Sequence, residues 1–290
     1  MLWRLISFAK KRRREWLARR REAILARPIR LGVLAIMKNE SINIDEWIEH
    51  YLWMGAEKVY LIDNGSTDDT LLNARKWEET GRVAVIELTG KYQQVKHYWT
   101  AIKHFDIRRT CDWLLIADLD EFWFCPNGDS IPVALRDFQN FDVVYSNWVL
   151  FGSDGLVDQP SSIRRSFVHR KPGVDLHINT KYICRTSVIK RKSSLGIHKI
   201  IGADSSRTIS DITRFQLNHY PIQSLSFFTS VKMTRGDVAT PMHDHVRDMD
   251  YFRRYDEGCT EIDRKLADLV SSQGLKNRDS TNSTSGKTTG

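Results

Sequence analysis

Residues 114–124 read LLIADLDEFWF, an apolar run that ends in acids. The run is typical of a strand that is buried on both faces, and Asp118, Asp120 and Glu121 follow it directly. Acidic side chains beside a buried strand are costly unless a cation pairs with them. Two carboxylates at positions i and i+2 after a strand suit a hard divalent cation that keeps open positions for phosphate oxygens. This stretch therefore predicts a cation site at the end of a strand.

Upstream of this stretch, strand and helix patterns alternate. Short apolar runs alternate with segments that have helical apolar spacing, and Gly55 and Gly81 end two of the helices. The predicted strands cover residues 31–37, 58–63, 82–88 and 112–117, and the predicted helices cover 44–55, about 70–80, and 91–105. Four such alternations predict an α/β fold, in which helices cover the faces of a mostly parallel sheet.

After Asp120 the pattern is less regular. Strand-forming residues are frequent in 142–152, 164–170 and 180–185, and helical spacing returns in 224–236 and over roughly 246–271. From about residue 273 the chain is rich in Ser, Thr, Asn and Gly, and such a segment cannot bury enough apolar area to order itself. We therefore expect a domain over residues 31–272 and a disordered tail over 273–290.

The charge of the chain is concentrated at its start. The formal net charge of the 290 residues is +8, but residues 1–30 hold 11 basic residues against two acids. The remainder is nearly neutral and its basic residues do not cluster, so nucleic acid is not an expected partner. The four cysteines form no CxxC pair, which favours free thiols in a reducing cytosol.

Residues 1–30 predict a basic amphipathic helix or extension. Apolar residues lie near one side of the helix and Arg and Lys around the rest, a pattern that suits an anionic membrane surface; a solvated helix is the alternative. No run of about 20 apolar residues predicts a membrane span, and the segment lacks the apolar core and cleavage site of a signal peptide. We expect a cytoplasmic protein, peripheral on the inner face of the membrane.

Polar residues gather at the carboxyl ends of three predicted strands. These ends read MKNE at 37–40, DNGSTDD at 63–69 and DLDE at 118–121. Open parallel sheets bind ligands at this edge. No GxGxxG follows the first strand, so a glycine-rich turn does not cradle phosphate here, and the charge of a diphosphate must be offset in another way.

Two longer segments carry a family resemblance. AIMKNESINIDEWIEHYLWMGAEKVYLIDNGSTDDT at 35–70 and DWLLIADLDEFWF at 112–124 resemble glycosyltransferases of families 2 and 92, particularly a bacterial branch formerly called a domain of unknown function. The similarity continues to GIHKI and LNHYPIQSLSFFTSVKMTRGD, and covers roughly residues 31–262. The resemblance implies the nucleotide-sugar-binding architecture called GT-A, with Asp118 and Asp120 as its acidic DXD motif.

The resemblance also implies residues that hold the donor nucleotide. Asn39, Glu40 and Asp63 would contact its base and ribose, and Gln94 matches a glutamine of the bacterial branch. Their side chains can hydrogen bond to base edges or ribose hydroxyls. Turn formation and capping are the alternative for Asn39 and Asp63, and a surface position on a helix is the alternative for Gln94.

The metal implied by the resemblance is Mn²⁺ or Mg²⁺, bridging the two phosphates of the donor. Asp120 would contact it directly, with Asp118 towards the ribose or a metal-bound water. A late histidine often supplies a further ligand, and His198 and His219 are equal candidates, although a hydrogen-bonded structural role is the alternative for each. The HDH at 243–245 is interpreted as a solvated loop.

Families 2 and 92 transfer sugars with inversion, which requires a base for the acceptor hydroxyl. Asp237 and Asp256 lie where the family pattern continues, and of the two we expect Asp256. The Asp-x-Asn common at the latter position reads Asp-Glu-Gly here, and either aspartate can instead cap a helix. Trp148 is a candidate for the acceptor side or the core, and Lys181 for phosphate binding or an exposed salt bridge.

The sequence thus predicts a metal-dependent, inverting glycosyltransferase. It would move a sugar from a nucleotide diphosphate donor, a UDP-sugar, to a hydroxyl of a glycan or lipid-linked acceptor in bacterial polysaccharide synthesis. One alternative is a non-catalytic, membrane-surface nucleotide-binding protein. A Rossmann-like methyltransferase or dehydrogenase is the other, and it is disfavoured because MKNE supplies no glycines after the first strand.

Overall fold

The computed structural model describes residue 16 and residues 27–91, 93–173, 180–234 and 247–273. The predicted tail, apart from residue 273, and nearly all of the predicted basic segment therefore lie outside the described residues. The same holds for Asp237 and for the HDH at 243–245.

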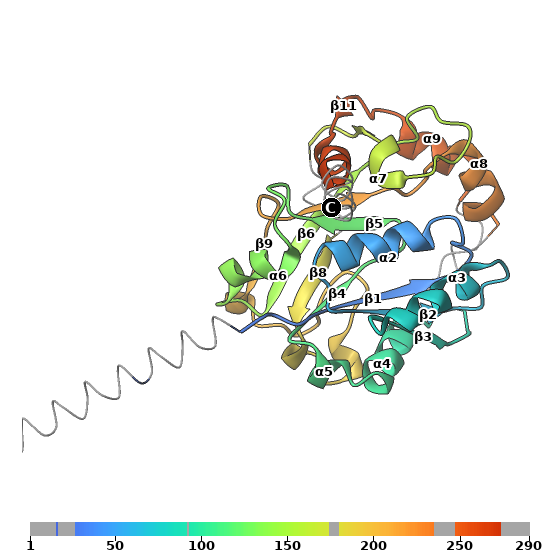
Figure 1. Ribbon diagram of the computed structural model, residues 1–290. Coiled ribbons are helices and arrows are strands. Elements are labelled where there is room, and N and C mark those ends of the chain that lie inside the picture. The colour runs from blue at the N-terminus through green and yellow to red at the C-terminus, as the bar shows by residue number, and fades with distance from the viewer. Residues whose placement is uncertain (1–15, 17–26, 92, 174–179, 235–246, 274–290) are drawn as a thin grey trace, which may run out of the picture.

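The centre of the protein is a curled, nine-stranded sheet (Figure 1). Its strands follow the order β3-β2-β1-β4-β8-β6-β10-β5, with β9 beside β6, and β7 and β11 form a separate pair. The strands are β1 (Leu31–Met37), β2 (Lys58–Asp63), β3 (Val83–Glu87), β4 (Trp113–Ile116), β5 (Glu121–Phe124), β6 (Val143–Leu150), β7 (His169–Arg170), β8 (Thr180–Arg185), β9 (Thr208–Ser210), β10 (Gln216–His219) and β11 (Glu261–Ile262).

The first four strands are parallel neighbours, and this confirms the predicted α/β fold. In the register, Leu34 lies opposite Tyr60 of β2 and opposite Ile116 of β4. The second part of the sheet is mixed, because β8 runs antiparallel to both β4 and β6, and β5 runs antiparallel to β10.

The helices cover both faces of the sheet (Figure 1). They are α2 (Ile44–Trp53), α3 (Thr70–Lys76), α4 (Gln94–His104), α5 (Ile107–Thr110), α6 (Ile131–Ala134), α7 (Ile163–Ser166), α8 (Leu225–Phe227) and α9 (Met249–Asp256), with a further helix over 265–273. Short 3₁₀ segments are η1 (Trp77–Thr80), η2 (Leu135–Phe138), η3 (Thr186–Val188), η4 (Lys192–Ser194) and η5 (Ser205–Arg207), and η6 (Phe228–Lys232) is a π-helical turn.

Alternating side chains of β1 pack into two separate cores. Val33 and Ala35 join the core that contains α2, whereas Leu34 and Ile36 join the core that contains α4. All seven residues of β1 are buried, as expected for a strand covered on both faces. This packing fixes where the carboxyl end of β1 meets that of β4.

Several elements differ from the predictions. Residues 121–124 and 216–219 form the paired strands β5 and β10, which the patterns did not indicate, and residues 163–166 are helical where a strand was expected. The predicted helix over 246–271 is interrupted by β11, which pairs with β7. For β5, β10 and β11 the pairing partner is distant in sequence, and local periodicity cannot report it.

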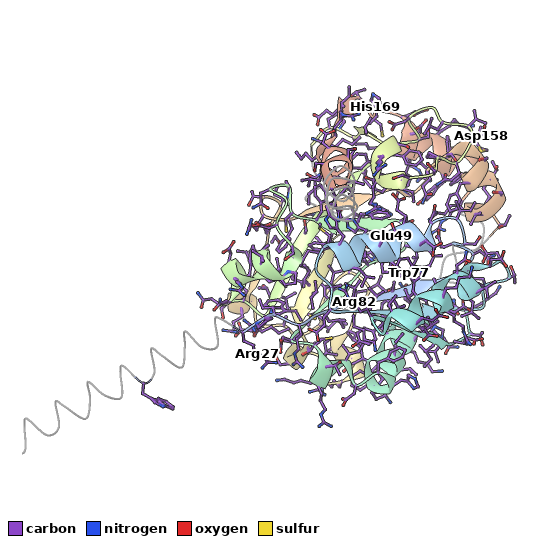
Figure 2. The ribbon with its side chains drawn as sticks, in the orientation of Figure 1. Arg27, Glu49, Trp77, Arg82, Asp158 and His169 are labelled. Carbon is purple, nitrogen blue, oxygen red and sulfur yellow. The ribbon has the colours of Figure 1, made fainter. Side chains whose placement is uncertain are left out.

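The amino-terminal edge of the sheet lies opposite the acidic turn, which is formed by residues 118–121. Arg27, labelled in Figure 2, lies at the edge where β1 begins, and Asp118 and Asp120 follow the other end of the neighbouring strand β4. Among the described residues, no helix is long and apolar enough to cross a membrane. All four cysteines are free thiols, as predicted, and three of them are buried.

Candidate functional site

A cavity of about 260 Å³ opens at the carboxyl ends of β1 and β4. Its walls come from the ends of these strands, from α4, from the loop before His198, and from the segments around η6 and α9. The residues that line it are Ile36, Met37, Lys38, Glu40, Asn64, Gln94, Asp118, Leu119, Asp120, Trp148, Ile197, His198, His219, Pro221, Lys232, Arg247, Tyr251 and Tyr255. The edge of the sheet at which the sequence predicts ligand binding is thus the edge that is hollowed.

Helix α2 holds the acidic turn from behind. The Trp47 Nε1–H donates to the backbone oxygens of Asp118, at 2.9 Å, and Glu121, at 3.2 Å. The Tyr51 hydroxyl donates to the same Glu121 oxygen at 3.0 Å. Trp47 and Tyr51 are fully buried, so the turn is attached to a rigid core, and this fixes the direction in which its carboxylates leave the backbone.

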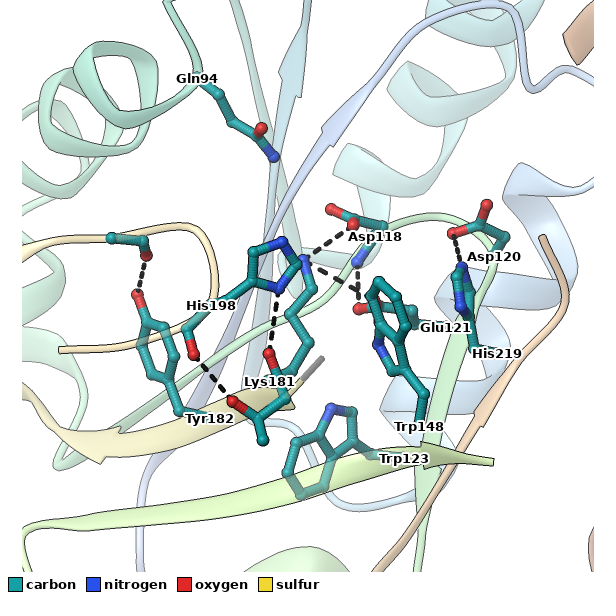
Figure 3. Close-up of polar contacts among 12 residues, drawn as sticks. Gln94, Asp118, Asp120, Glu121, Trp123, Trp148, Lys181, Tyr182, His198 and His219 are labelled. Atoms are coloured by element: carbon teal, nitrogen blue, oxygen red, sulfur yellow. Dashed lines mark hydrogen bonds and ion pairs between the residues drawn. The ribbon is translucent and has the colours of Figure 1, made fainter. Parts of the chain in front are cut away.

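The Glu121 side chain accepts two hydrogen bonds within the site. Its Oε2 accepts from the Asp118 backbone N–H at 2.9 Å and its Oε1 accepts from the Trp148 indole N–H at 2.8 Å (Figure 3). Burial raises the pKa of Glu121 well above its usual value; Lys181 opposes this, and the Asp118 and Asp120 carboxylates add to it. Sequence reasoning assigned Glu121 no role; the structure gives it the positioning of Asp118 and Trp148.

Lys181 is fully buried behind Asp118 (Figure 3). Its Nζ lies 2.8 Å from Asp118 Oδ2 and 3.7 Å from Glu121 Oε1. Burial lowers the pKa of Lys181, but the two carboxylates more than reverse this and raise it above its ordinary value. The expectation of an exposed salt bridge is wrong, because β8 lies inside the sheet between β4 and β6 and both of its faces are covered.

Asp120 faces two further groups. Its Oδ2 lies 2.6 Å from Lys232 Nζ, and its Oδ1 lies 3.6 Å from His219 Nε2. Burial would raise the pKa of Asp120, but the Lys232 ammonium and the His219 ring hold it well below its usual range. Asp120 is therefore a buried carboxylate that stays ionised.

The side chains around Asp120 fit a divalent metal. Asp120 Oδ1 and His219 Nε2 are too far apart for a hydrogen bond, and both atom types ligate Mn²⁺. His219 Nδ1 is buried without a partner in the described part of the chain. No cluster of three or more metal-binding side chains occurs among the described residues. Nucleotide sites need fewer metal-binding side chains than this, since Mg²⁺ and Mn²⁺ are commonly held by one or two carboxylates plus substrate phosphates and water.

His198 lies on the same wall of the cavity. Its Nδ1–H donates to the Thr180 backbone oxygen at 3.1 Å, so Nε2 keeps its lone pair in the neutral ring. Burial lowers the pKa of His198, and Lys181 lowers it further, which favours that neutral form. Trp148 lies between the two histidines, with ring centroids 5.6 Å from His198 and 4.1 Å from His219.

Comparison with known proteins shows which family the chain belongs to. The profile described as Glycosyltransferase family 92 matches residues 35–263, which are most of the chain and include the carboxyl ends of β1 and β4. The chain belongs to glycosyltransferase family 92. The family 92 protein At1g27200 of Arabidopsis thaliana is 23% identical over 209 residues, which are 64% of this chain and 31% of that protein.

A second family 92 relative and two solved structures are also similar to parts of the chain. The family 92 protein Os08g0121900 of Oryza sativa subsp. japonica is 22% identical over 166 residues, 56% of this chain and 26% of that protein, so the chain spans less than a third of these relatives. Residues 1–349 of S. aureus TarS give a TM-score of 0.43 at 15% identity, covering 69% of this chain and 63% of that one. GalNAc-T7 with UDP, GalNAc and Mn²⁺ gives 0.40 at 11%, covering 71% and 48%.

Two predicted donor residues of the family 92 chain shape its loops. Asn39 has φ +52° and its Oδ1 accepts from the Thr67 backbone N–H at 2.8 Å. Asp63 Oδ2 accepts from the backbone N–H groups of Gly65, at 3.0 Å, and Ser66, at 3.1 Å. Neither residue belongs to the described lining of the cavity. Both residues therefore form turns, which is the alternative that the sequence analysis gave for them.

Asn64, which sequence reasoning missed, does line the cavity. Its side chain is 8% exposed and its Oδ1 has no partner within the described chain. The sequence could have indicated Asn64, because it directly follows Asp63, the last residue of β2. A buried amide oxygen without a partner favours a ligand that can donate a hydrogen bond to it.

Glu40 and Gln94 both lie on the wall of the cavity. Glu40 is 2% exposed, accepts from the Asn43 side-chain amide at 3.1 Å and lies 3.8 Å from Lys232 Nζ. Gln94 begins α4 and donates to the Tyr98 hydroxyl at 2.6 Å. The expected alternative, a surface position for Gln94, is wrong because its side chain is only 7% exposed.

The predicted base Asp256 lies at the end of α9. Its Oδ1 accepts from the Ser153 backbone N–H at 2.7 Å, and it is outside the described lining, whereas the neighbouring Tyr255 is part of that lining. Tyr251 and Arg247 join Tyr255 on this wall, and sequence reasoning had assigned none of the three.

Proposed function

We propose that this protein is a metal-dependent, inverting glycosyltransferase that uses a UDP-sugar and transfers its sugar to a hydroxyl of a glycan or lipid-linked acceptor. One observation carries the proposal. In a chain of glycosyltransferase family 92, Asp118, Asp120 and His219 line a single cavity at the carboxyl edge of the parallel sheet. That edge is where α/β sheets bind nucleotides.

The residues of the site suit stabilisation of a departing nucleoside diphosphate. Asp120 and His219 would hold Mn²⁺ or Mg²⁺, and the bound ion would offset the negative charge that develops as the glycosidic bond breaks. Trp47, Tyr51 and Glu121 keep the acidic turn in place before the donor arrives. This preorganisation spares the site the cost of rearranging its charges during the reaction.

The same cavity offers groups for the nucleoside and the acceptor. Glu40, Asn64 and Gln94 are hydrogen-bonding side chains on the donor side. Trp148 lines the cavity, and an aromatic ring there would suit stacking on a sugar. Asp237 and Asp256 remain the candidates for the base that takes the proton of the acceptor hydroxyl as its oxygen attacks the anomeric carbon.

The experiment is incubation with a panel of radiolabelled UDP-sugars in Mn²⁺, followed by separation of free sugar. We expect slow, Mn²⁺-dependent hydrolysis of one donor, since transferases commonly pass the sugar to water when no acceptor is present. Asp69→Asn changes an exposed acid just before α3 whose side chain makes no capping hydrogen bond, and it serves as the matched control, with unchanged hydrolysis. Tight UDP binding without hydrolysis or transfer to any tested acceptor would favour the non-catalytic alternative instead.

We further propose that the basic segment 1–30 holds the enzyme on the cytoplasmic face of an anionic membrane. The support is its 11 basic residues interspersed with apolar ones. Deleting residues 1–26 should remove sedimentation with vesicles that contain anionic lipid, because each cation near the surface contributes about 1 kcal/mol. Full-length protein with neutral vesicles is the control. Equal sedimentation of the full-length and shortened proteins with anionic vesicles would contradict the proposal.

A further inference from the structure

Lys232 occupies an unusual place for a lysine. It ends η6, its side chain is 2% exposed, and it lines the same cavity as Asp118 and Asp120. Its Nζ lies 2.6 Å from Asp120 Oδ2 and 3.8 Å from Glu40 Oε1. A lysine is rarely buried to this degree, and then it is paired, as here. The ammonium therefore lies within the acidic site and is turned away from bulk solvent.

The ion pair between Lys232 and Asp120 opposes the binding of a metal when no nucleotide is bound. A divalent ion held by Asp120 Oδ1 would share one carboxylate with the Lys232 ammonium on Oδ2. Like charges this close in a poorly solvated site repel strongly. Asp120 and Glu40 carry two negative charges between them, whereas a dication and the Lys232 ammonium carry three positive charges.

A diphosphate would remove this conflict. Its oxygens are strong acceptors, and a lysine ammonium binds phosphate as a point charge with three donors. Lys232 already lines the cavity, so it can pass from Asp120 to a phosphate oxygen by rotation of its side chain. Asp120 would then be released for the metal.

We propose that Lys232 binds the diphosphate of the donor, and that in the nucleotide-free protein it holds Asp120, so that metal and nucleoside diphosphate bind cooperatively. This inference rests on the proposed function and adds a diphosphate-binding residue to it. Cooperativity follows because the diphosphate draws Lys232 away from Asp120. This frees Asp120 for the metal and removes the repulsion between the metal and the ammonium.

The test compares wild type with Lys232→Met, which keeps the length of the chain and removes its charge. Mn²⁺ binding is measured by electron paramagnetic resonance of free Mn²⁺, and UDP and uridine binding by calorimetry. Without nucleotide, the variant should bind Mn²⁺ at least fivefold more tightly than wild type. With Mn²⁺, it should bind UDP roughly ten- to a hundredfold more weakly, as expected for one charge-assisted hydrogen bond. Uridine affinity should not change.

The opposite signs of these two effects distinguish the proposal from a structural role. Unchanged Mn²⁺ affinity, or equal losses for UDP and uridine, would overturn it. Lys103→Met, which removes a charge from the exposed surface of α4, should match wild type in all three measurements.

A measurement on wild type alone covers the case in which Lys232→Met does not fold. UDP should strengthen Mn²⁺ binding by the protein at least tenfold beyond the chelation of Mn²⁺ by UDP in solution, and uridine should not. Independent binding of UDP and Mn²⁺ would overturn the inference while leaving a UDP site in place. A wild type that binds no nucleoside diphosphate at all would instead overturn the proposed function.

Discussion

Replacing Asp120 by asparagine is expected to lower the rate of sugar transfer or donor hydrolysis by about 10²–10³, the loss typical when one preorganised group that stabilises developing charge is removed. Asparagine keeps the shape of the side chain but gives up the negative charge that faces His219 and Lys232. The UDP affinity of the variant should become independent of Mn²⁺. The measurement is the initial rate of hydrolysis together with UDP calorimetry, with and without Mn²⁺.

The same variant should lose stability, and a double variant separates the two effects. Asp120→Asn removes the carboxylate charge nearest to the buried Lys232 ammonium, which lies 2.6 Å from Asp120 and 3.8 Å from Glu40, at a cost of roughly 3 kcal/mol in the free energy of unfolding. Asp120→Asn combined with Lys232→Met removes both charges and should recover most of that stability in urea unfolding. It should not recover activity. A double variant as active as wild type would show that Asp120 serves the fold and not the reaction.

Lys181→Met is expected to be the most destabilising single substitution at the site. It leaves Glu121 fully buried, and Asp118 partly buried, without their cation, and breaking a buried ion pair in this way costs about 3–5 kcal/mol. Because marginal stability is typical of globular domains, the variant should unfold at a much lower urea concentration than wild type. The urea midpoint, read by the fluorescence of the tryptophans, measures the loss.

The control for Lys181→Met is Lys190→Met, at an exposed position shortly after β8. It removes the same charge from the surface and should change stability by less than about 0.5 kcal/mol. If both variants had the same urea midpoint as wild type, Lys181 would not be the counter-ion of the acidic turn.

The parallel half of the sheet could be predicted from the sequence because its strands are covered on both faces. Such strands read as continuous apolar runs, and β1 and β2 match the predicted ranges. The position of β8 was also predicted, but not its neighbours. It enters between β4 and β6, and that insertion is what buries Lys181. A strand's neighbours depend on long-range pairing, which periodicity does not encode.

The acidic pair was located from the sequence, but its partners were not. Asp118 and Asp120 lie two and four residues after Ile116, the last residue of the apolar strand β4, and this local signal needs no tertiary information. Lys232 lies 112 residues away from Asp120, in a π-helical turn, and only the folded chain brings the two together. Asn39 and Asp63 were correctly placed at strand ends, but their side chains are used by the adjacent loops.

The central claim is that the cavity beside Asp118 and Asp120 holds a nucleoside diphosphate together with a divalent ion. Calorimetric titration of the full-length protein with UDP, in Mn²⁺ and then in a chelator, measures this directly. We expect one UDP per chain in Mn²⁺ and at least tenfold weaker binding in the chelator. Equal affinity under the two conditions, or no binding under either, would contradict the account.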